Sequence, residues 1–392
     1  MTWFRKAGEI SPLQVRTIEV VVDRINATPG GSAFWVQGAA GTGKTIVLCH
    51  IARQLEAKQR NLRIMFLTYT HALKGMIEQA VKEAGSDAAV STYKRFLYSD
   101  KRKYDIILLD EVQDVDRHEL VDLRSRCNHL VIAGDCEQRI YEPDNTEEVI
   151  IETIPCEKRR LLELFRVTKF IVKAAKSILP NTILAEGDVQ KIRDASASVI
   201  RFANPRQEAR WAFEEAIAMA RPKYPAVILL PHHGAILDFC QELAIDMDIA
   251  GSGPKISVKN GKIEDYNCLN KHFEFHNVAV RYFGNGIGDL SDAGGRPLVF
   301  IMTYHSSKGL DFDVVHMPFL NSDTQIVRYN STFDRQELER NLFFVAMTRS
   351  RERLVMSHSG QNPHPLVDLL PRDAVVFRDY QEPAFEEEED LF

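Results

Sequence analysis

The sequence predicts an α/β fold with two units, each built on a sheet of buried parallel strands. Short apolar segments recur along the 392 residues, and each ends at a polar or glycine-rich turn that is followed by helical periodicity. This arrangement is typical of parallel strands that helices cover on both faces. The pattern runs through the first 135 residues and begins again near residue 225. Two such units in one chain predict a cleft between them.

The apolar segments give the positions of the individual strands. The first unit has predicted strands at residues 33–36, 64–67, 106–109 and 130–133. The second unit has predicted strands at residues 226–230, 298–302, 314–317 and 353–356. The chain length suits two or three domains, and a hydrophobic content of 45% is enough to give each domain a core.

The composition excludes several classes of protein. The chain has 49 Lys and Arg against 55 Asp and Glu, a net charge of −6, so a polyanion would need a localised basic site. The six cysteines form no Cys-x-x-Cys pair and no zinc-type spacing, and we expect reduced thiols. No signal-peptide core follows the N-terminus and no apolar run approaches about 18 residues, so we expect a cytoplasmic protein.

Residues 38–45 read Gly-Ala-Ala-Gly-Thr-Gly-Lys-Thr and match the phosphate-binding loop pattern between a strand and a helix. Backbone N–H groups of such a loop surround phosphates at a helix N-terminus, while the lysine bridges the β and γ phosphates and the last threonine ligates Mg²⁺. The alternative is a glycine-rich turn that binds nothing. The predicted nucleotide contacts here are Gly38, Gly41, Thr42, Gly43, Lys44 and Thr45.

An acidic pair follows the third predicted strand. Asp110 and Glu111 lie at the carboxyl end of this strand, where ligands of open parallel sheets bind. Asp110 suits a carboxylate that helps to hold Mg²⁺ together with Thr45, and Glu111 suits the base that orients the attacking water. Acidic pairs also cap helices after strands, which is the alternative interpretation.

Further segments with motif-like sequences lie at residues 10–14, 67–73, 91–93, 110–114, 133–141, 164–166, 303–312 and 341–353. Residues 110–114 read Asp-Glu-Val-Gln-Asp, and residues 303–312 read Thr-Tyr-His-Ser-Ser-Lys-Gly-Leu-Asp-Phe. In this order the segments resemble the boxes of superfamily 1 helicases of the UvrD/Rep/PcrA-like branch. The resemblance spans residues 10–355 and implies two RecA-like P-loop motor domains with parallel sheets and an ATP cleft between them. It implies a first domain at 1–160, a second at 161–380 and an acidic tail at 381–392.

The resemblance also implies roles at the nucleotide site. Gln14 would hydrogen-bond to the edge of adenine, and Phe165 would stack on it. Asp311, close to Gly309, would accept a hydrogen bond from a ribose hydroxyl. Gln138 would face the γ-phosphate. The implied catalytic set is Lys44, Asp110, Glu111, Gln138, Arg166 and Arg349, with ATP and Mg²⁺ as cofactors.

The same boxes imply contacts to a single strand of nucleic acid. The implied residues are Thr68, Tyr69, Thr70, Ser91, Tyr93, Tyr141, Thr303 and His305. Tyrosines in these positions, with Tyr304, could stack on bases, or they could simply pack in the core. The adjacent pair His232 and His233 suggests a surface or backbone contact rather than a metal site.

The resemblance implies an ATP-dependent translocase on single-stranded nucleic acid, and the wording of the last two boxes favours a 3′ to 5′ DNA helicase over the 5′ to 3′ branch. RNA stays open as a substrate. Only about 40 residues separate Thr70 from Asp110, and residues 251–294 leave room for a reduced insertion, so large accessory domains are not expected. The alternative function is an ATP-gated switch or sensor subunit that recruits a partner such as a nuclease.

The last residues carry one more hypothesis. Four glutamates and an aspartate precede Leu391 and Phe392. Such a run should stay solvated and disordered. It resembles the acidic, Phe-terminated tails of single-strand-binding proteins and the ends of clamp-binding peptides, so a protein partner is the functional alternative to a solubilising tail.

Overall fold

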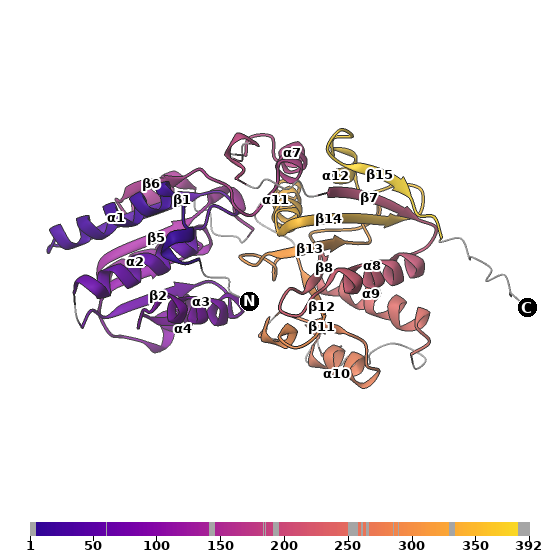
Figure 1. Ribbon diagram of the computed structural model, residues 1–392, viewed down its shortest axis with the longest axis horizontal. Helices are drawn as coiled ribbons and strands as arrows, with labels where there is room; N and C mark the ends of the chain where they lie inside the picture. The colour runs from indigo at the N-terminus through magenta and orange to yellow at the C-terminus, as the bar shows by residue number, and fades with distance from the viewer. Residues whose placement is uncertain are drawn as a thin grey trace, which may run out of the picture.

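Two parallel sheets organise the chain (Figure 1). The computed structural model describes residues 5–59, 61–140, 146–182, 184, 186–190, 196–249, 258–259, 262–263, 266–284, 286–288, 290–328 and 334–382. Within these ranges one sheet has six strands and the other has seven. The predicted α/β fold with two RecA-like, parallel-sheet domains is confirmed.

The first sheet has the strand order β3-β2-β4-β5-β1-β6, and every neighbouring pair is parallel. Its strands are β1 (Ser32–Gly38), β2 (Ile64–Thr68), β3 (Ala89–Thr92), β4 (Tyr104–Leu109), β5 (Cys127–Gly134) and β6 (Glu157–Leu161). The helices of this part are α1 (Pro12–Ala27), α2 (Lys44–Lys58), α3 (His71–Ala84), α4 (Tyr93–Ser99), α5 (Arg117–Ser125) and α6 (Glu147–Thr153).

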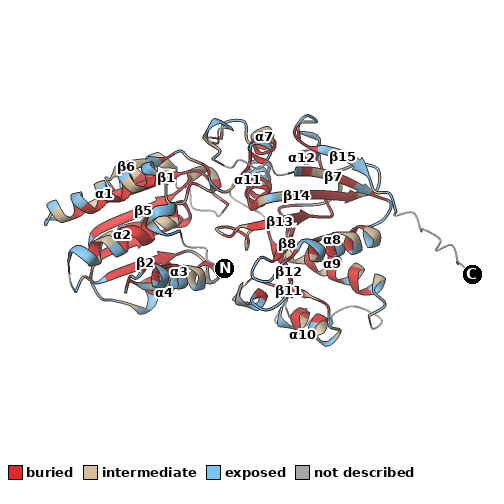
Figure 2. Cartoon of the chain, in the orientation of Figure 1, coloured by how far each residue is buried: buried red, intermediate tan, exposed pale blue. Residues whose placement is uncertain are grey.

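Helices cover both faces of this sheet because its central strands are largely apolar on both faces. In β1, Phe34 and Val36 belong to the core beneath α1, α2 and α3, whereas Trp35 belongs to the core beneath α4, α5 and α6. Successive side chains of a strand point to opposite faces, so a continuous apolar segment fills two cores at once. Figure 2 shows these strands as buried ribbons between helices whose outer surfaces are exposed.

The second sheet has the order β11-β12-β8-β13-β14-β7-β15, again with parallel neighbours. Its strands are β7 (Ser196–Phe202), β8 (Ala226–Leu230), β11 (Val280–Tyr282), β12 (Val299–Thr303), β13 (Phe312–Met317), β14 (Ser350–Ser359) and β15 (Val376–Asp379). The helices are α7 (Lys169–Ile178), α8 (Pro205–Met219), α9 (His233–Asp246), α10 (Asn267–Phe275), α11 (Arg335–Met347) and α12 (Pro365–Asp368). A short antiparallel pair, β9 (Val258–Lys259) and β10 (Lys262–Ile263), lies in the segment predicted as a reduced insertion.

The two domains share a continuous core at their junction. Buried residues of the first sheet, of α7 and of α11 form a single apolar cluster, and α7 and α11 lie between the two sheets in Figure 1. Leu73 of α3 packs so closely against Gly309 that a side chain at Gly309 would come within 2.5 Å of the leucine. The close approach fixes where the turn before β13 meets the first domain.

None of the helices in the described ranges is long and apolar enough to cross a bilayer. All six cysteines are free thiols. Residues 383–392 of the predicted acidic tail, with Leu391 and Phe392, lie outside the described residues.

Candidate active site

The glycine-rich loop between β1 and α2 is shaped by backbone conformations that favour glycine. Gly41 and Gly43 have φ angles of 85° and 83°, in the left-handed region. A side chain at Gly41 would meet the Cβ atom of Arg166 at 2.7 Å, and one at Gly43 would meet Nε2 of Gln14 at 2.5 Å. The loop can therefore wrap closely only because these positions lack a Cβ atom.

Lys44 and Thr45 open α2 at the end of this loop. The buried ammonium group of Lys44 donates to the carbonyl oxygens of Gly38 at 2.8 Å and Ala39 at 3.1 Å. Thr45 donates through Oγ1 to Oδ2 of Asp110 at 2.6 Å. The loop thus gathers one cation and one hydroxyl at a helix N-terminus, which suits an anionic ligand.

Asp110 and Glu111 extend from the carboxyl end of β4 towards this loop. Burial raises the pKa of Asp110, and the neighbouring Glu111 carboxylate adds to the effect although the hydrogen bond from Thr45 opposes it. A hydroxyl oxygen and a buried carboxylate in contact are oxygen ligands of the type that Mg²⁺ prefers. The residues present therefore fit a magnesium ion.

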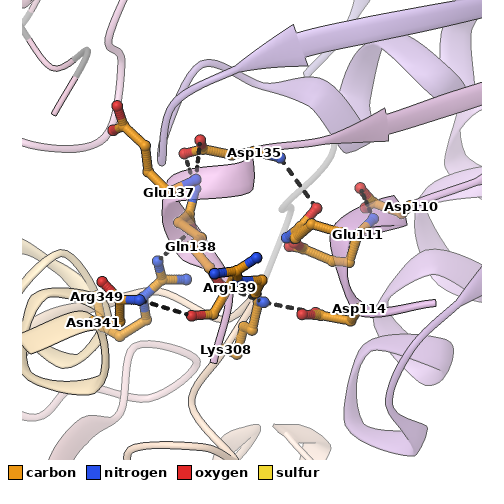
Figure 3. A network of polar contacts seen from close by, with 11 residues as sticks. Asp110, Glu111, Asp114, Asp135, Glu137, Gln138, Arg139, Lys308, Asn341 and Arg349 are labelled. Atoms are coloured by element: carbon orange, nitrogen blue, oxygen red, sulfur yellow. Dashed lines mark hydrogen bonds and ion pairs between the residues drawn. The ribbon is translucent and has the colours of Figure 1, made fainter. Parts of the chain in front are cut away.

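Glu111 has a backbone φ of 58°, a left-handed conformation that is uncommon for a residue with a side chain. Gln113, in the short helical turn η2 (Val112–Asp114), donates to its carboxylate at 2.5 Å, and the same amide accepts from the backbone N–H of Asp135 at 3.1 Å (Figure 3). Burial would raise the pKa of Glu111, but Lys308, Lys44 and Gln113 together hold it below the usual range. Glu111 is therefore a fixed, ionised carboxylate.

Gln138 links this arrangement to the second domain. Its amide donates to Asp135 at 2.7 Å, and its carbonyl oxygen accepts from Nη2 of Arg349 at 3.2 Å (Figure 3). Arg349 is 1% exposed and is fixed in place by the backbone oxygens of Val345 and Leu310, at 2.9 Å and 3.2 Å. A guanidinium from the second domain thus contacts Gln138, whose amide in turn contacts the Asp135 carboxylate of the first domain.

Lys308 forms a second link that sequence reasoning missed as a site residue. Its ammonium group lies 2.6 Å from Oδ2 of Asp114 and 2.5 Å from the backbone oxygen of Gln138. The side chains of Lys308 and Asp114 are 2% and 0% exposed. Both residues lie inside segments noted in the sequence, but sequence order alone does not bring residues 194 positions apart into contact.

A cavity of about 680 Å³ unites these elements. Its lining includes most of the predicted nucleotide and catalytic residues: Gln14, Gly41, Gly43, Lys44, Thr45, Glu111, Gln138, Phe165, Arg166, Gly309, Asp311 and Arg349. Asp110 reaches it through Thr45, while Gly38 and Thr42 lie within the loop behind it. Arg5, Arg221, Tyr224, Asp313 and Arg351 also line it, and sequence reasoning did not find them.

Nε of Arg166 and Oδ1 of Asp311 are buried at this cavity, and neither has a hydrogen-bond partner among the residues that the structure describes. The other oxygen of Asp311 is paired with Nε of Arg351 at 2.7 Å. Arg166 lies in the segment that joins the two sheets and packs on Gly41, so it sits against the first domain's loop. A donor and an acceptor that lack partners suit a ligand with both phosphate oxygens and hydroxyl groups.

Comparison with protein families identifies both halves of the chain. An AAA domain model matches residues 24–144, and a UvrD-like helicase C-terminal domain model matches residues 286–361. The two matches support a UvrD-like superfamily 1 helicase. The two matches contain the glycine-rich loop and the acidic pair in the first domain, and Lys308 and Arg349 in the second.

Solved helicase structures are similar to this chain at low sequence identity and with TM-scores below 0.5. Arterivirus nonstructural protein 10, a helicase, has a TM-score of 0.45 and 14% identity over 89% of this chain, and the chain covers 63% of its length. The same viral helicase in complex with DNA has a TM-score of 0.45 and 13% identity over 89% of this chain, and the chain covers 64% of its length. The C-terminal domain of a possible DNA helicase from Lactobacillus plantarum WCFS1 gives a TM-score of 0.34 and 14% identity over 54% of this chain and 98% of that one. No curated protein matches the sequence at a significant level.

This UvrD-like chain buries some of the residues predicted to contact nucleic acid. Thr68, Tyr93 and Thr303 are 0%, 2% and 3% exposed. The hydroxyl of Thr303 is already engaged by Ser306 at 2.9 Å, and Tyr304 is fully buried. In this structure the side chains of Thr68, Tyr93 and Thr303 pack beneath the surface, and their contact with nucleic acid stays a prediction.

The other predicted contacts are partly exposed. Tyr69 lies with its ring 5.4 Å from that of Tyr93, and Thr70 caps α3 by accepting from the backbone of Leu73 at 3.3 Å. Ser91 and His305 are also partly exposed. Burial and nearby Lys308 lower the pKa of His305 to about 4, so its imidazole is neutral near pH 7. Tyr141 lies outside the described residues.

Proposed function

We propose that the chain is an ATP-dependent translocase on single-stranded nucleic acid, with the properties of a compact 3′ to 5′ DNA helicase. The observation that carries the proposal is the shared cavity. It joins Lys44, Thr45 and Glu111 of the first domain with Arg349 and Asp311 of the second. A nucleotide bound there would contact both domains, so its hydrolysis would change how the domains hold each other.

The chain's own residues suit phosphoryl transfer to water. Lys44 would exchange its loop carbonyl partners for phosphate oxygens. Glu111, ionised and held by Gln113, would orient the attacking water. Arg166 and Arg349 would face the charge that builds up on the transferred group. When bound between Thr45 and Asp110, Mg²⁺ would supply further neutralisation of that charge.

A physical connection runs from the proposed nucleic-acid side to this centre. The turn at residues 303–311 carries His305 at its start, Lys308 at its middle and Asp311 at its end. Lys308 contacts Asp114, and Asp311 lines the nucleotide cavity. A shift of this turn caused by a bound strand would therefore move groups next to Glu111, which gives a route for strand-stimulated hydrolysis.

ATP hydrolysis by the purified chain, with and without an oligonucleotide, tests the proposal. We expect a low basal rate of ATP hydrolysis. A single-stranded oligonucleotide should stimulate this rate strongly, and a blunt-ended duplex should not. Failure of single strands to stimulate hydrolysis would contradict the proposal. Unwinding assays on 3′-tailed and 5′-tailed duplexes made of DNA or RNA then test the polarity and the substrate. Stimulated hydrolysis without unwinding or displacement would favour the switch or sensor function.

A further inference from the structure

A stack of aromatic rings lies on the second domain outside the nucleotide cavity. The ring of Tyr266 is 5.0 Å from that of Tyr282 with an interplanar angle of 18°, and 4.5 Å from the imidazole of His233. His233 also shares a hydrogen bond of 3.0 Å with the Tyr282 hydroxyl. The rings of His233, Tyr266 and Tyr282, from three segments of the chain, thus form one aromatic cluster, which we call the tier.

The sheet brings these segments together. In the order β11-β12-β8, Tyr282 pairs with Ile301 and Leu230 pairs with Thr303, so the three strands end at the same edge. His233 starts α9 just after β8, and Tyr266 directly precedes α10. The sequence separates these rings by up to 49 positions, which is why the sequence analysis grouped His233 with His232 and not with the two tyrosines.

The tier has a rigid base and an accessible outer member. Tyr282 is 1% exposed, and its backbone N–H and carbonyl are both bonded by the side chain of Asn270, at 2.6 Å and 3.1 Å. Tyr266 and His233 are only partly buried. His232 is occupied differently, since its Nδ1 accepts from the backbone N–H of Ala235 and so caps α9.

The tier adjoins the turn that the family resemblance assigns to the nucleic-acid strand. A side chain at Gly284 would come within 2.9 Å of the Ser306 hydroxyl and 3.0 Å of the Tyr282 hydroxyl, so the two hydroxyls face each other across this glycine. Ser306 in turn contacts Thr303. The exposed Arg328 lies over the first turn of α9, close to Gly234. A guanidinium near the start of α9, on the same side as the partly exposed rings of His233 and Tyr266 that adjoin α9 and α10, suits a ligand with alternating phosphates and flat bases.

We propose that Tyr266, supported by Tyr282 and His233, is a stacking platform for an unpaired base of the single strand, with Arg328 as a phosphate contact. The inference rests on the proposed function and names the residues that hold the strand on the second domain. Stacking on an aromatic ring is tolerant of sequence and of DNA or RNA, because every base has a flat face.

Strand affinity of Tyr266→Ala tests the platform. Each variant is titrated by fluorescence anisotropy against an oligothymidylate and against an abasic deoxyribose-phosphate strand of equal length. We expect Tyr266→Ala to bind oligothymidylate about 5- to 150-fold more weakly than the unmodified chain and to bind the abasic strand equally well. Tyr266→Phe should retain most of the affinity because it keeps the ring.

Phe275→Ala is the matched control, since Phe275 ends the same helix and its ring is 84% exposed but lies outside the tier. Nucleotide binding by each variant reports that the protein is folded. Equal oligothymidylate affinity for Tyr266→Ala, Phe275→Ala and the unmodified chain would overturn the platform while leaving the proposed function intact. If the unmodified chain binds no single strand, the proposed function itself fails and the platform with it.

Discussion

Replacing Lys308 by methionine removes the cation of a buried ion pair that joins the two domains. The Lys308 ammonium lies 2.6 Å from the Asp114 carboxylate, and neither side chain is more than 2% exposed. Removing one partner of such a pair leaves an uncompensated buried charge and costs about 3 to 5 kcal/mol. We therefore expect Lys308→Met to lower the free energy of unfolding in urea by about 3 kcal/mol at pH 8.

The charge account predicts two further results for this variant. Burial raises the pKa of Asp114 to about 7 even though Lys308 opposes the rise, so without Lys308 the carboxyl should take up a proton readily. The loss should therefore be smaller at pH 6 than at pH 8. The double variant Lys308→Met with Asp114→Asn should lose less than the sum of the two single variants, by about 2 kcal/mol, because no buried charge then lacks a partner.

The Lys58–Asp23 pair gives a matched control. Its N···O distance is similar, 2.7 Å, but the side chains are 50% and 68% exposed. Lys58→Met should therefore cost less than about 1 kcal/mol. Two results would contradict a buried ion pair. One is a stability loss in the double variant that equals the sum of the losses in Lys308→Met and Asp114→Asn to within about 0.5 kcal/mol. The other is a loss for Lys308→Met no larger than that for Lys58→Met.

Three other predictions concern the core and the nucleotide site. Burial raises the pKa of Glu208 to about 7, so its contribution favours the folded state below about pH 4.5 and is lost as the pH rises through 7. In urea unfolding, Glu208→Gln should therefore be more stable than the unmodified chain by up to about 3 kcal/mol at pH 8 and by almost nothing at pH 4. An equal difference at both pH values would contradict this. Phe165→Ala should raise KM for ATP about fivefold with kcat little changed, and an unchanged KM would remove Phe165 from the base contacts. Arg349→Ala should slow single-turnover hydrolysis about 1,000-fold or more while ATP binding persists, whereas Lys44→Ala should lose ATP binding. If ATP affinity falls as far for Arg349→Ala as for Lys44→Ala, the two residues do not have these different roles.

Sequence patterns could predict the buried strands but not all strands. The segments that end at Asp110 and at Leu230 are continuous apolar runs, so their strand character needs no tertiary information. By contrast, β6 reads Glu-Lys-Arg-Arg-Leu and lies at a sheet edge with exposed Lys158 and Arg160. Its hydrogen bonds to β1 decide its conformation, and no local hydrophobic pattern reports them.

The candidate site divides in the same way. Residues whose role depends on local backbone shape, such as Gly41 and Lys44, follow from the wording of one loop. Lys308 acquires its contact with Asp114 only when the two domains meet, and Arg351 in β14 pairs with Asp311 and Asp313 at the start of β13, so the partners of both are set by tertiary structure. Tyr93 is predicted to contact nucleic acid from the motif at residues 91–93. Its burial at the start of α4, in the core that contains Leu67 and Phe96, depends on packing that the motif does not specify.

Movement along a strand is the central claim, and displacement of streptavidin from biotinylated single-stranded DNA measures it directly. We expect ATP-dependent displacement from the 5′ end and little from the 3′ end. Glu111→Gln should displace none but should still bind ATP. Displacement from the 3′ end instead would reverse the polarity. Stimulated ATP hydrolysis with no displacement from either end would contradict translocation.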